Sequence, residues 1–326
     1  MRHLTARAES WPTAGAFRIA RASITARTVV VVEIAEGGCT GRGECVPYPR
    51  YDETPERTLA EIERWRPAIE QGLERDDLQR VLGAGAARNA LDCALWDLEA
   101  KRTGVPVWRR AGLPEPGPVT TAYTISLDEP AAMAEAARTN AERPLLKVKL
   151  DGERVVERIA AVRRASPAAR IIVDPNESWT VELMRALAAE LVALGVAMIE
   201  QPLGAGADQA LAGLGYPIPL GADESFHDRA TLDALVGRYD LVNVKLDKTG
   251  GLTEAIAVAR AAQGLGFRLM VGCMVATSLA MAPAVMLAPL AEVVDLDGPL
   301  LLARDRVPGL RYDGGTLWPP ETALWG

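Results

Sequence analysis

Short apolar runs recur at nearly constant spacing over the last two thirds of the sequence, and this regularity constrains the fold more than any other feature. Each interval of 22 to 27 residues has about the length of a strand, a helix and two short loops. Eight runs at this regular spacing favour a closed barrel of the α/β class over an open sheet. A Pro/Gly-rich tail follows the eighth run in place of a helix, so the predicted fold is a (β/α)7β TIM-type barrel. The runs end near Thr124, Lys149, Asp174, Glu200, Asp223, Lys245, Gly272 and Asp297.

The first third of the chain has a different, α+β pattern. Residues Thr28–Ile34 form a β-branched run typical of a strand, and Pro55–Gly72 and Ala86–Thr103 have the apolar spacing of helices. The proline-rich segment Pro114–Pro118 is the clearest linker. We therefore predict an α+β domain over residues 1–115 and a barrel over residues 116–303, with the tail, 304–326, returning to the first domain.

Composition excludes several classes of protein. A net charge of −7 without a basic stripe argues against nucleic-acid binding. The sequence contains no apolar run of 18 residues, so no membrane contact is expected. The four cysteines are scattered, and the start of the chain does not resemble a signal peptide, which together predict a cytoplasmic protein with reduced thiols.

Three carboxylates, Asp174, Glu200 and Asp223, end three consecutive predicted strands. Active sites of such barrels lie at the carboxyl ends of the strands, so these side chains are expected to converge. An all-oxygen ligand set suits Mg²⁺, and Mn²⁺ as an alternative. Asn176 and Glu224 are expected beside the ligands. In the alternative interpretation each acidic residue only caps the helix that follows it.

Lysines lie on two opposite strands of the predicted barrel. Lys147 and Lys149 are two residues apart and therefore share a face, and Lys245 ends a strand four steps later. Burial and mutual repulsion are expected to lower the pKa of Lys147 and Lys149 towards that of a general base. An acid and a base on opposite faces can invert a carbon centre. Alternatively, Lys245 serves as a counter-ion to the carboxylates.

The last predicted strand ends with Asp295 and Asp297, which also share a face. Two spare carboxylates in a water-poor mouth favour a cation, and a substrate ammonium group fits. The alternative is a polar loop that ends the strand. His3 and His227 are the only histidines, and neither suggests a hydrolase triad.

These residues resemble the enolase superfamily, specifically its muconate-lactonising subgroup, in which Lys-x-Lys, three carboxylates and a further lysine occupy consecutive strands in the same order. The resemblance covers the whole chain. It implies that the first domain and the tail cap the barrel, with specificity loops at about Pro12–Thr28 and Pro47–Thr54. Other segments similar to the family are Trp11–Pro12, Gly43–Cys45, Arg88–Asp97 and Lys245–Gly251.

The Asp-x-Asp pair is similar to that of dipeptide epimerases, where it holds the amino terminus of the substrate. The segments Val46–Tyr51 and Gly272–Met274 resemble those of bacterial L-Ala-D/L-Glu epimerases, which act in cell-wall peptide recycling. The resemblance implies a Mg²⁺-dependent isomerase in which one of Lys149 and Lys245 removes the α-proton of the C-terminal residue. The other lysine returns a proton to the opposite face of the planar enolate, and Lys147 stabilises carboxylate charge.

The resemblance also implies a set of substrate contacts. One departure concerns Ile24, which stands where close relatives carry arginine, so the loop offers only Arg18, Arg21 and Arg27 and the preferred side chain stays open. The expected substrate-binding residues are Asp295, Asp297, Thr124, Arg21, Tyr51, Cys273 and Val275.

Rival activities within the superfamily are N-acylamino acid racemase, o-succinylbenzoate synthase and muconate cycloisomerase. Their substrates lack a free ammonium group, so Asp295 and Asp297 favour a dipeptide. A barrel that only binds a ligand is disfavoured, because two opposed buried lysines would cost desolvation energy without a use. The predicted partner is thus a small dipeptide, and a homo-oligomer is compatible with the sequence.

Overall fold

Eight parallel strands form the barrel. The computed structural model describes all residues, 1–326, and its main sheet has the order β12-β11-β10-β9-β8-β7-β6-β5. A backbone hydrogen bond of 2.8 Å from Ala122 N to Val294 O joins the two edges of this sheet. The predicted (β/α)7β TIM-type barrel is thereby confirmed. The strands are β5 (Tyr123–Ile125), β6 (Leu145–Lys149), β7 (Arg170–Asp174), β8 (Val196–Glu200), β9 (Leu220–Ala222), β10 (Leu241–Val244), β11 (Arg268–Val271) and β12 (Val293–Val294).

Helices connect most of these strands, but two connections differ from the prediction. The segments after β8 and β9 contain only 3-10 turns, at Asp208–Leu211, Arg229–Thr231 and Asp233–Leu235. Glycine and proline are frequent between residues 202 and 219, and both residues disfavour helix interiors. The connecting helices are α5 (Pro130–Thr139), α6 (Val155–Ala165), α7 (Val181–Ala193), α8 (Leu246–Thr249), α9 (Leu252–Gly264) and α10 (Ser278–Val285), followed by 3-10 turns Ala288–Leu290 and Gly298–Leu301.

Alternation along the strands divides the barrel interior into an apolar floor and a charged mouth. On β6, Leu145, Lys147 and Lys149 share the inward face because successive side chains point to opposite sides. Leu145 belongs to a separate buried cluster that fills the floor, and the lysines lie above it. The members of this cluster are Ala122, Leu145, Ile172, Met198, Leu241, Met270 and Val293.

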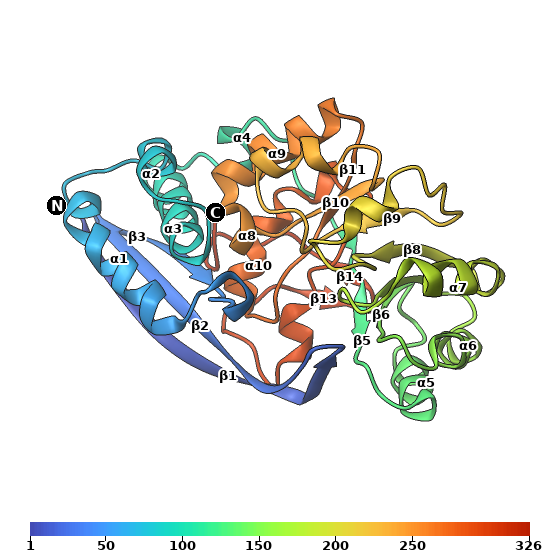
Figure 1. Ribbon diagram of the computed structural model, residues 1–326. Helices are drawn as coiled ribbons and strands as arrows, with labels where there is room; N and C mark the ends of the chain where they lie inside the picture. Colours follow the sequence, from blue (N-terminus) through green and yellow to red (C-terminus); the bar gives the residue numbers. More distant parts are fainter.

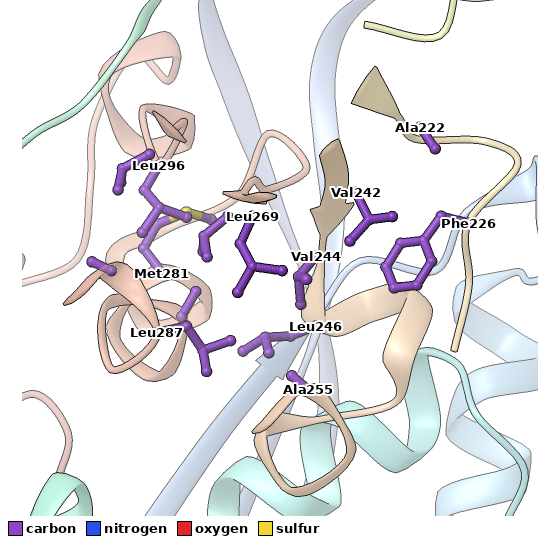
Figure 2. Close-up of a cluster of buried hydrophobic side chains, with 14 of the residues drawn as sticks. Ala222, Phe226, Val242, Val244, Leu246, Ala255, Leu269, Met281, Leu287 and Leu296 are labelled. Carbon is purple, nitrogen blue, oxygen red and sulfur yellow. The ribbon is translucent and has the colours of Figure 1, made fainter. Parts of the chain in front are cut away.

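A larger buried cluster lies between the strands and the surrounding helices. Figure 2 shows part of it, where Val242 and Val244 of β10 lie near Leu246 of α8 and Leu269 of β11. This cluster holds the strands in place from the outside. The positions of the inward-facing charged residues are therefore set by the strand ends that carry them. No helix of the protein is long and apolar enough to cross a membrane.

The N-terminal unit is a three-stranded antiparallel sheet covered by helices (Figure 1). The predicted specificity loop at Pro12–Thr28 is instead largely a β-hairpin, in which Phe17 pairs with Ile24 around a turn at Ala20–Arg21. The β-branched residues Ile24 and Thr25 favour the extended conformation found there. Its elements are β1 (His3–Ile19), β2 (Ala22–Glu36), β3 (Cys39–Cys45), a 3-10 turn at Pro49–Tyr51, α1 (Pro55–Glu70), α2 (Arg75–Val81), α3 (Ala86–Thr103) and α4 (Val107–Arg110).

Helix α3 attaches this unit to the barrel through the segment that follows β10. The guanidinium of Arg88 donates to the carbonyls of Thr249, at 2.7 Å, and Gly250, at 3.0 Å. Asp92 accepts hydrogen bonds from the backbone and the hydroxyl of Thr253. Gly251 has φ 111°, and a Cβ there would meet the Asp92 carboxylate at 2.5 Å, so glycine is required at this close approach.

The C-terminal tail contacts both parts of the protein. Strands β13 (Tyr312–Asp313) and β14 (Thr316–Leu317) pair with β4 (Val119–Thr120) beside the barrel. Beyond them, Trp325 Nε1 donates to the carbonyl of Cys93, and Gly326 N donates to Asp97, both on α3. The chain terminus therefore lies against the N-terminal unit (Figure 1).

Candidate active site at the barrel mouth

A cavity of about 630 Å³ opens where the hairpin and the segment after β3 meet the carboxyl ends of the barrel strands. Of the predicted site residues, Asp174 and Glu200 do not line the cavity; both are 0 % exposed. The predicted residues that do line it are Lys147, Lys149, Lys245, Asp223, Asn176, Glu224, Thr124, Asp295, Asp297, Arg21, Tyr51, Cys273 and Val275.

The two lysines of β6 are both held by buried carboxylates. Nζ of Lys147 lies 2.6 Å from an oxygen of Glu200 and 2.7 Å from one of Asp295. Nζ of Lys149 donates a 2.5 Å hydrogen bond to Asp174, its direct neighbour in the register of β6 and β7. Inward-facing residues of adjacent strands are thus brought together as ion pairs.

Lys245 reaches the same cavity from the opposite side of the barrel. It follows β10, which is separated from β6 by three strands in the sheet order. Its Nζ lies 2.6 Å from Oδ2 of Asp223. Lys248, one helical turn further, donates to the carbonyl and to Oδ1 of Asp223, both at 2.6 Å. The cavity therefore has an ammonium group on each of two opposite walls.

Glu200 lies at the centre of the buried charges and is positioned from β10. Asn243 Nδ2 donates a 2.8 Å hydrogen bond to Oε1 of Glu200. Asn243 can take this position because Gly272, directly after the neighbouring strand β11, has no side chain; a Cβ there would lie 2.8 Å from Nδ2 and 3.0 Å from Cγ of Asn243. The glycine, the amide and the carboxylate thus form one packed unit.

Asn176 and Glu224 lie beside the carboxylates, where the sequence places them. Asn176 donates to Asp174 through its backbone N–H, at 2.8 Å, and through Nδ2, at 3.2 Å. Glu224 accepts a 2.6 Å hydrogen bond from Nη2 of Arg21 and forms an ion pair with it. Arg21 also donates to the hydroxyl of Tyr48 and to the carbonyl of Asn176. These contacts occupy the guanidinium of Arg21, which therefore fixes the hairpin tip to the barrel.

Asp295 and Asp297 both face the cavity, but they are not two spare carboxylates. Oδ2 of Asp295 accepts from Lys147, and Oδ2 of Asp297 accepts a 2.6 Å hydrogen bond from the backbone of Thr124. Oδ1 of Asp295 is buried and has no hydrogen-bond partner. Burial and the charge of Asp295 raise the pKa of Asp297 to about 7. A cationic group entering here would meet the unpartnered Oδ1 of Asp295 and the carboxyl group of Asp297.

The donor set fits a hard divalent cation. Asp174, Glu200 and Asp223 supply only oxygen atoms, and the buried Oε2 of Glu200 has only the ammonium of Lys147, at 2.6 Å, as a polar neighbour. Burial, with the charges of Asp174 and Asp223, raises the pKa of Glu200 to about 7. In this structure the three carboxylates do not form a metal-binding arrangement, and neither does any other group of three His, Cys, Asp or Glu side chains. Lysine ammonium groups lie among them instead.

The expectation that burial and repulsion lower the lysine pKa is wrong for Lys147, and the pKa of Lys245 is raised as well. Burial acts in that direction, but Asp295, Glu200 and Asp174 outweigh it and hold the pKa of Lys147 well above its usual value. Asp223 and Glu200 likewise raise the pKa of Lys245 against the effect of burial. Both side chains are therefore ammonium ions in this arrangement.

Several residues of the site were not found from the sequence. Asn243 lies two residues before Lys245 and shares its inward face, which is a signal that strand alternation offers. Lys248 lies within the Lys245–Gly251 segment, but nothing in its spacing indicates that it contacts Asp223. Gln201 Oε1 accepts hydrogen bonds from the backbone N–H groups of Asp223, at 2.9 Å, and Ser225, at 3.0 Å, and so positions the segment after β9. These contacts join separate strand ends and become visible only in three dimensions.

Comparisons with known proteins agree with this arrangement over the whole chain. Residues 1–112 match the mandelate racemase/muconate lactonizing enzyme N-terminal domain, and residues 129–323 match the enolase C-terminal domain-like family. The chain is 50% identical to the L-Ala-D/L-Glu epimerase of Escherichia coli over 311 residues, 95% of this chain and 97% of the relative. It is 46% identical to an N-acetyl-D-glutamate racemase of Pseudoalteromonas over 302 residues, 91% and 95% of the two chains.

Solved structures give the same result. An enolase family member from Agrobacterium tumefaciens, with bound sodium and L-Ala-L-Glu, has a TM-score of 0.98 and 49% identity, and each chain is covered completely. A dipeptide epimerase from Methylococcus capsulatus, complexed with Mg and L-Arg-D-Lys, has a TM-score of 0.90 and 32% identity over 98% of this chain and 97% of the other. The protein therefore belongs to the mandelate racemase/muconate lactonizing enzyme family of the enolase superfamily.

Proposed function

We propose that the protein is a dipeptide epimerase that inverts the α-carbon of the C-terminal residue of L-Ala-Xaa dipeptides. The observation that carries this proposal is the position of Lys149 and Lys245 on opposite walls of one cavity. A substrate carbon between them would have one lysine on each face. One lysine removes the α-proton as a neutral amine, and the other, as an ammonium ion, returns a proton to the opposite face.

The buried carboxylates define where the substrate carboxylate would bind. Asp174, Glu200 and Asp223 would hold a divalent cation, Mg²⁺ or Mn²⁺, through oxygen atoms. Mg is present in the related Methylococcus capsulatus enzyme. When bound, such a cation supplies positive charge for the negative charge that develops on the substrate carboxylate. Lys147, within 3.5 Å of Asp174 and 2.6 Å of Glu200, adds a second positive charge beside it.

The last strand provides the preference for a free amino terminus. Asp295 and Asp297 lie on the same cavity as the lysines, and one buried oxygen of Asp295 lacks a partner. An ammonium group is the complementary ligand, because it can donate to both carboxylates. The E. coli relative is an epimerase of L-Ala-D/L-Glu, which carries such a group.

Racemisation of N-acylated amino acids is the second candidate, because the Pseudoalteromonas relative is an N-acetyl-D-glutamate racemase. The pairing of Asp295 with Lys147 leaves less free negative charge for a substrate ammonium than two unpaired carboxylates would. The two activities share the same proton transfer and differ only at the amino end of the substrate.

Proton exchange with solvent tests the proposal directly. The protein is incubated with Mg²⁺ in D2O with L-Ala-L-Xaa dipeptides and, separately, with N-acetyl-L-amino acids. We expect one deuteron at the C-terminal α-carbon of dipeptides, measured by mass spectrometry, and formation of L-Ala-D-Xaa, measured by chiral chromatography. A double variant, Lys149→Ala/Lys245→Ala, gives the background. Exchange restricted to N-acetyl amino acids would support the second candidate, and exchange with neither class would refute both.

A further inference from the structure

Gln201 follows Glu200 directly and links the ends of three adjacent strands. Its backbone has φ 35°, a left-handed conformation that residues other than glycine rarely adopt. In this conformation its N–H donates a 2.7 Å hydrogen bond to the carbonyl of Gly221, on β9, and its carbonyl accepts a 2.9 Å hydrogen bond from the N–H of Glu177, after β7. The backbone of Gln201 therefore connects the ends of the three strands that carry the buried carboxylates.

The side chain of Gln201 does not line the cavity and is 0 % exposed. Its Oε1 accepts from the backbone N–H groups of Asp223, at 2.9 Å, and Ser225, at 3.0 Å. A backbone N–H can only donate, so these two contacts fix which end of the amide carries the oxygen. Nε2 then donates, and its acceptors are the carbonyl of Leu203, at 2.8 Å, and the hydroxyls of Ser225, at 2.8 Å, and Tyr239, at 2.9 Å. The amide is thus saturated in a single orientation.

The contact to Asp223 replaces a contact that the sheet does not make. Strand β9 ends at Ala222, and its pairing with β10 ends at the same residue. The N–H of Asp223 is therefore held by a side chain instead of by a neighbouring strand. A shift of the backbone at this residue would carry its carboxylate with it, away from the place that the other two carboxylates define.

Tyr239 and Asp208 extend this network away from the cavity, which neither residue lines. The hydroxyl of Tyr239 donates to Oδ2 of Asp208 at 3.1 Å, and both residues are buried. Because the hydroxyl proton is used there, the oxygen of Tyr239 accepts from Nε2 of Gln201. Without this hydroxyl, the two protons of Nε2 would still have the two acceptors on Leu203 and Ser225. Its loss would weaken the network without releasing the backbone contacts of Oε1.

We infer that Gln201 is a positioning residue that sets the place of Asp223 relative to Glu200, and thereby the affinity of the site for a divalent cation. Gln201 acts through the backbone of Asp223, because its amide contacts neither the cavity nor a carboxylate of the site. The inference rests on the proposed function only for the identity of the cation, and it holds whichever substrate is epimerised.

The test measures Mg²⁺ binding by calorimetry, without substrate, in the parent protein and in Gln201→Met. Methionine has a similar length but lacks the amide. Loss of a residue that orients metal ligands typically lowers metal affinity by about 10–100-fold, and we expect a loss of that size. The segment 221–226 should also lose protection against hydrogen exchange in the metal-free protein, measured by mass spectrometry, because two of its N–H groups lose their acceptor.

Tyr239→Phe is the matched control for a general loss of stability. This variant should lower the free energy of unfolding, measured with urea, because the buried carboxylate of Asp208 loses a donor. Its Mg²⁺ affinity should stay close to that of the parent protein, since Oε1 of Gln201 keeps its contact to Asp223. Stability and metal affinity are thereby separated.

Gln201→Asn provides a second variant in case Gln201→Met does not fold. Asparagine tolerates the left-handed backbone but is one methylene shorter, so its amide cannot make the same contacts and the same loss of affinity is expected. Parental Mg²⁺ affinity in a folded Gln201 variant, or an equal loss in Tyr239→Phe, would overturn the inference. Failure of both Gln201 variants to fold, or a parent protein that binds no Mg²⁺, would also overturn it. A parent protein that binds Mg²⁺ but epimerises no dipeptide would refute only the proposed function.

Discussion

Replacing Gly272 by alanine should disturb the carboxylate at the centre of the site without touching a charged residue. The new methyl group would lie 2.8 Å from Nδ2 and 3.0 Å from Cγ of Asn243, closer than carbon atoms pack. Asn243 must then move and lose its 2.8 Å hydrogen bond to Glu200. A hydrogen bond to a charged group is worth about 1.5–3 kcal/mol, and overpacking costs about 1–3 kcal/mol. We expect a loss of about 2–4 kcal/mol in the free energy of unfolding, measured with urea, and a lower kcat.

A double-mutant cycle separates the clash from other effects. In Asn243→Ala/Gly272→Ala the atoms that clash are gone, so the two losses should not add, and the double variant should be about as stable as Asn243→Ala. Gly264→Ala is the matched control, because nothing lies within 4 Å of its added methyl group and the residue is helical. That change should be neutral or slightly stabilising. Gly272→Ala with parental stability and kcat, or strictly additive losses, would refute the reasoning.

Three further predictions concern charged groups at the cavity. Changing Asp174 or Asp223 to Asn, or Glu200 to Gln, should weaken Mg²⁺ binding, measured by calorimetry, and abolish epimerisation; unchanged affinity in all three variants would remove them as ligands. Lys248→Met removes two hydrogen bonds to Asp223 and should lower metal affinity or activity by about 10–100-fold, as is typical for residues that orient ligands. Because the pKa of Asp297 is raised to about 7, its ionised fraction grows as pH rises. Therefore kcat/KM for a free dipeptide, measured from pH 6 to 7.5, should increase, and the increase should be smaller in Asp297→Asn, where only Glu200 still has a pKa of about 7; an identical profile in that variant would contradict the role.

Much of the site was predictable because strand alternation is a local property. Lys147 and Lys149 had to share a face, as did Asp295 and Asp297, whatever the rest of the fold. The spacing of the apolar runs then indicated which strand ends meet. The structure brings these side chains to one cavity through inward-facing positions that the periodicity alone assigns.

The electrostatics could not be predicted in the same way. The pKa of Lys147 depends on carboxylates from three other strands, and their attraction exceeds the effect of burial. Arg21 and Arg27 lie on one hairpin and look equivalent in sequence. Only the position of Glu224, about two hundred residues away in the chain, shows that one guanidinium is occupied and the other is not. Long-range pairing of this kind leaves no local pattern.

The connections after β8 and β9 illustrate a different limit. The sequence between residues 202 and 219 has the length of a helix and two loops, but its glycines and prolines favour 3-10 turns and irregular structure. Spacing alone therefore predicts the strands better than what connects them. The segment Pro12–Thr28 shows the opposite limit. It is expected as a loop, but most of its residues are extended and pair in a long hairpin.

The central claim, that two lysines act on opposite faces of one carbon, is tested most directly by stereospecific exchange in single variants. Lys149→Ala and Lys245→Ala are each incubated in D2O with the L,L and the L,D epimer of a dipeptide that the parent protein converts, and deuterium at the α-carbon is followed by NMR. We predict that neither variant interconverts the epimers, and that each exchanges the proton of only one epimer, a different one in the two variants. Epimerisation near the parent rate in either variant, or exchange of the same epimer in both, would contradict the account.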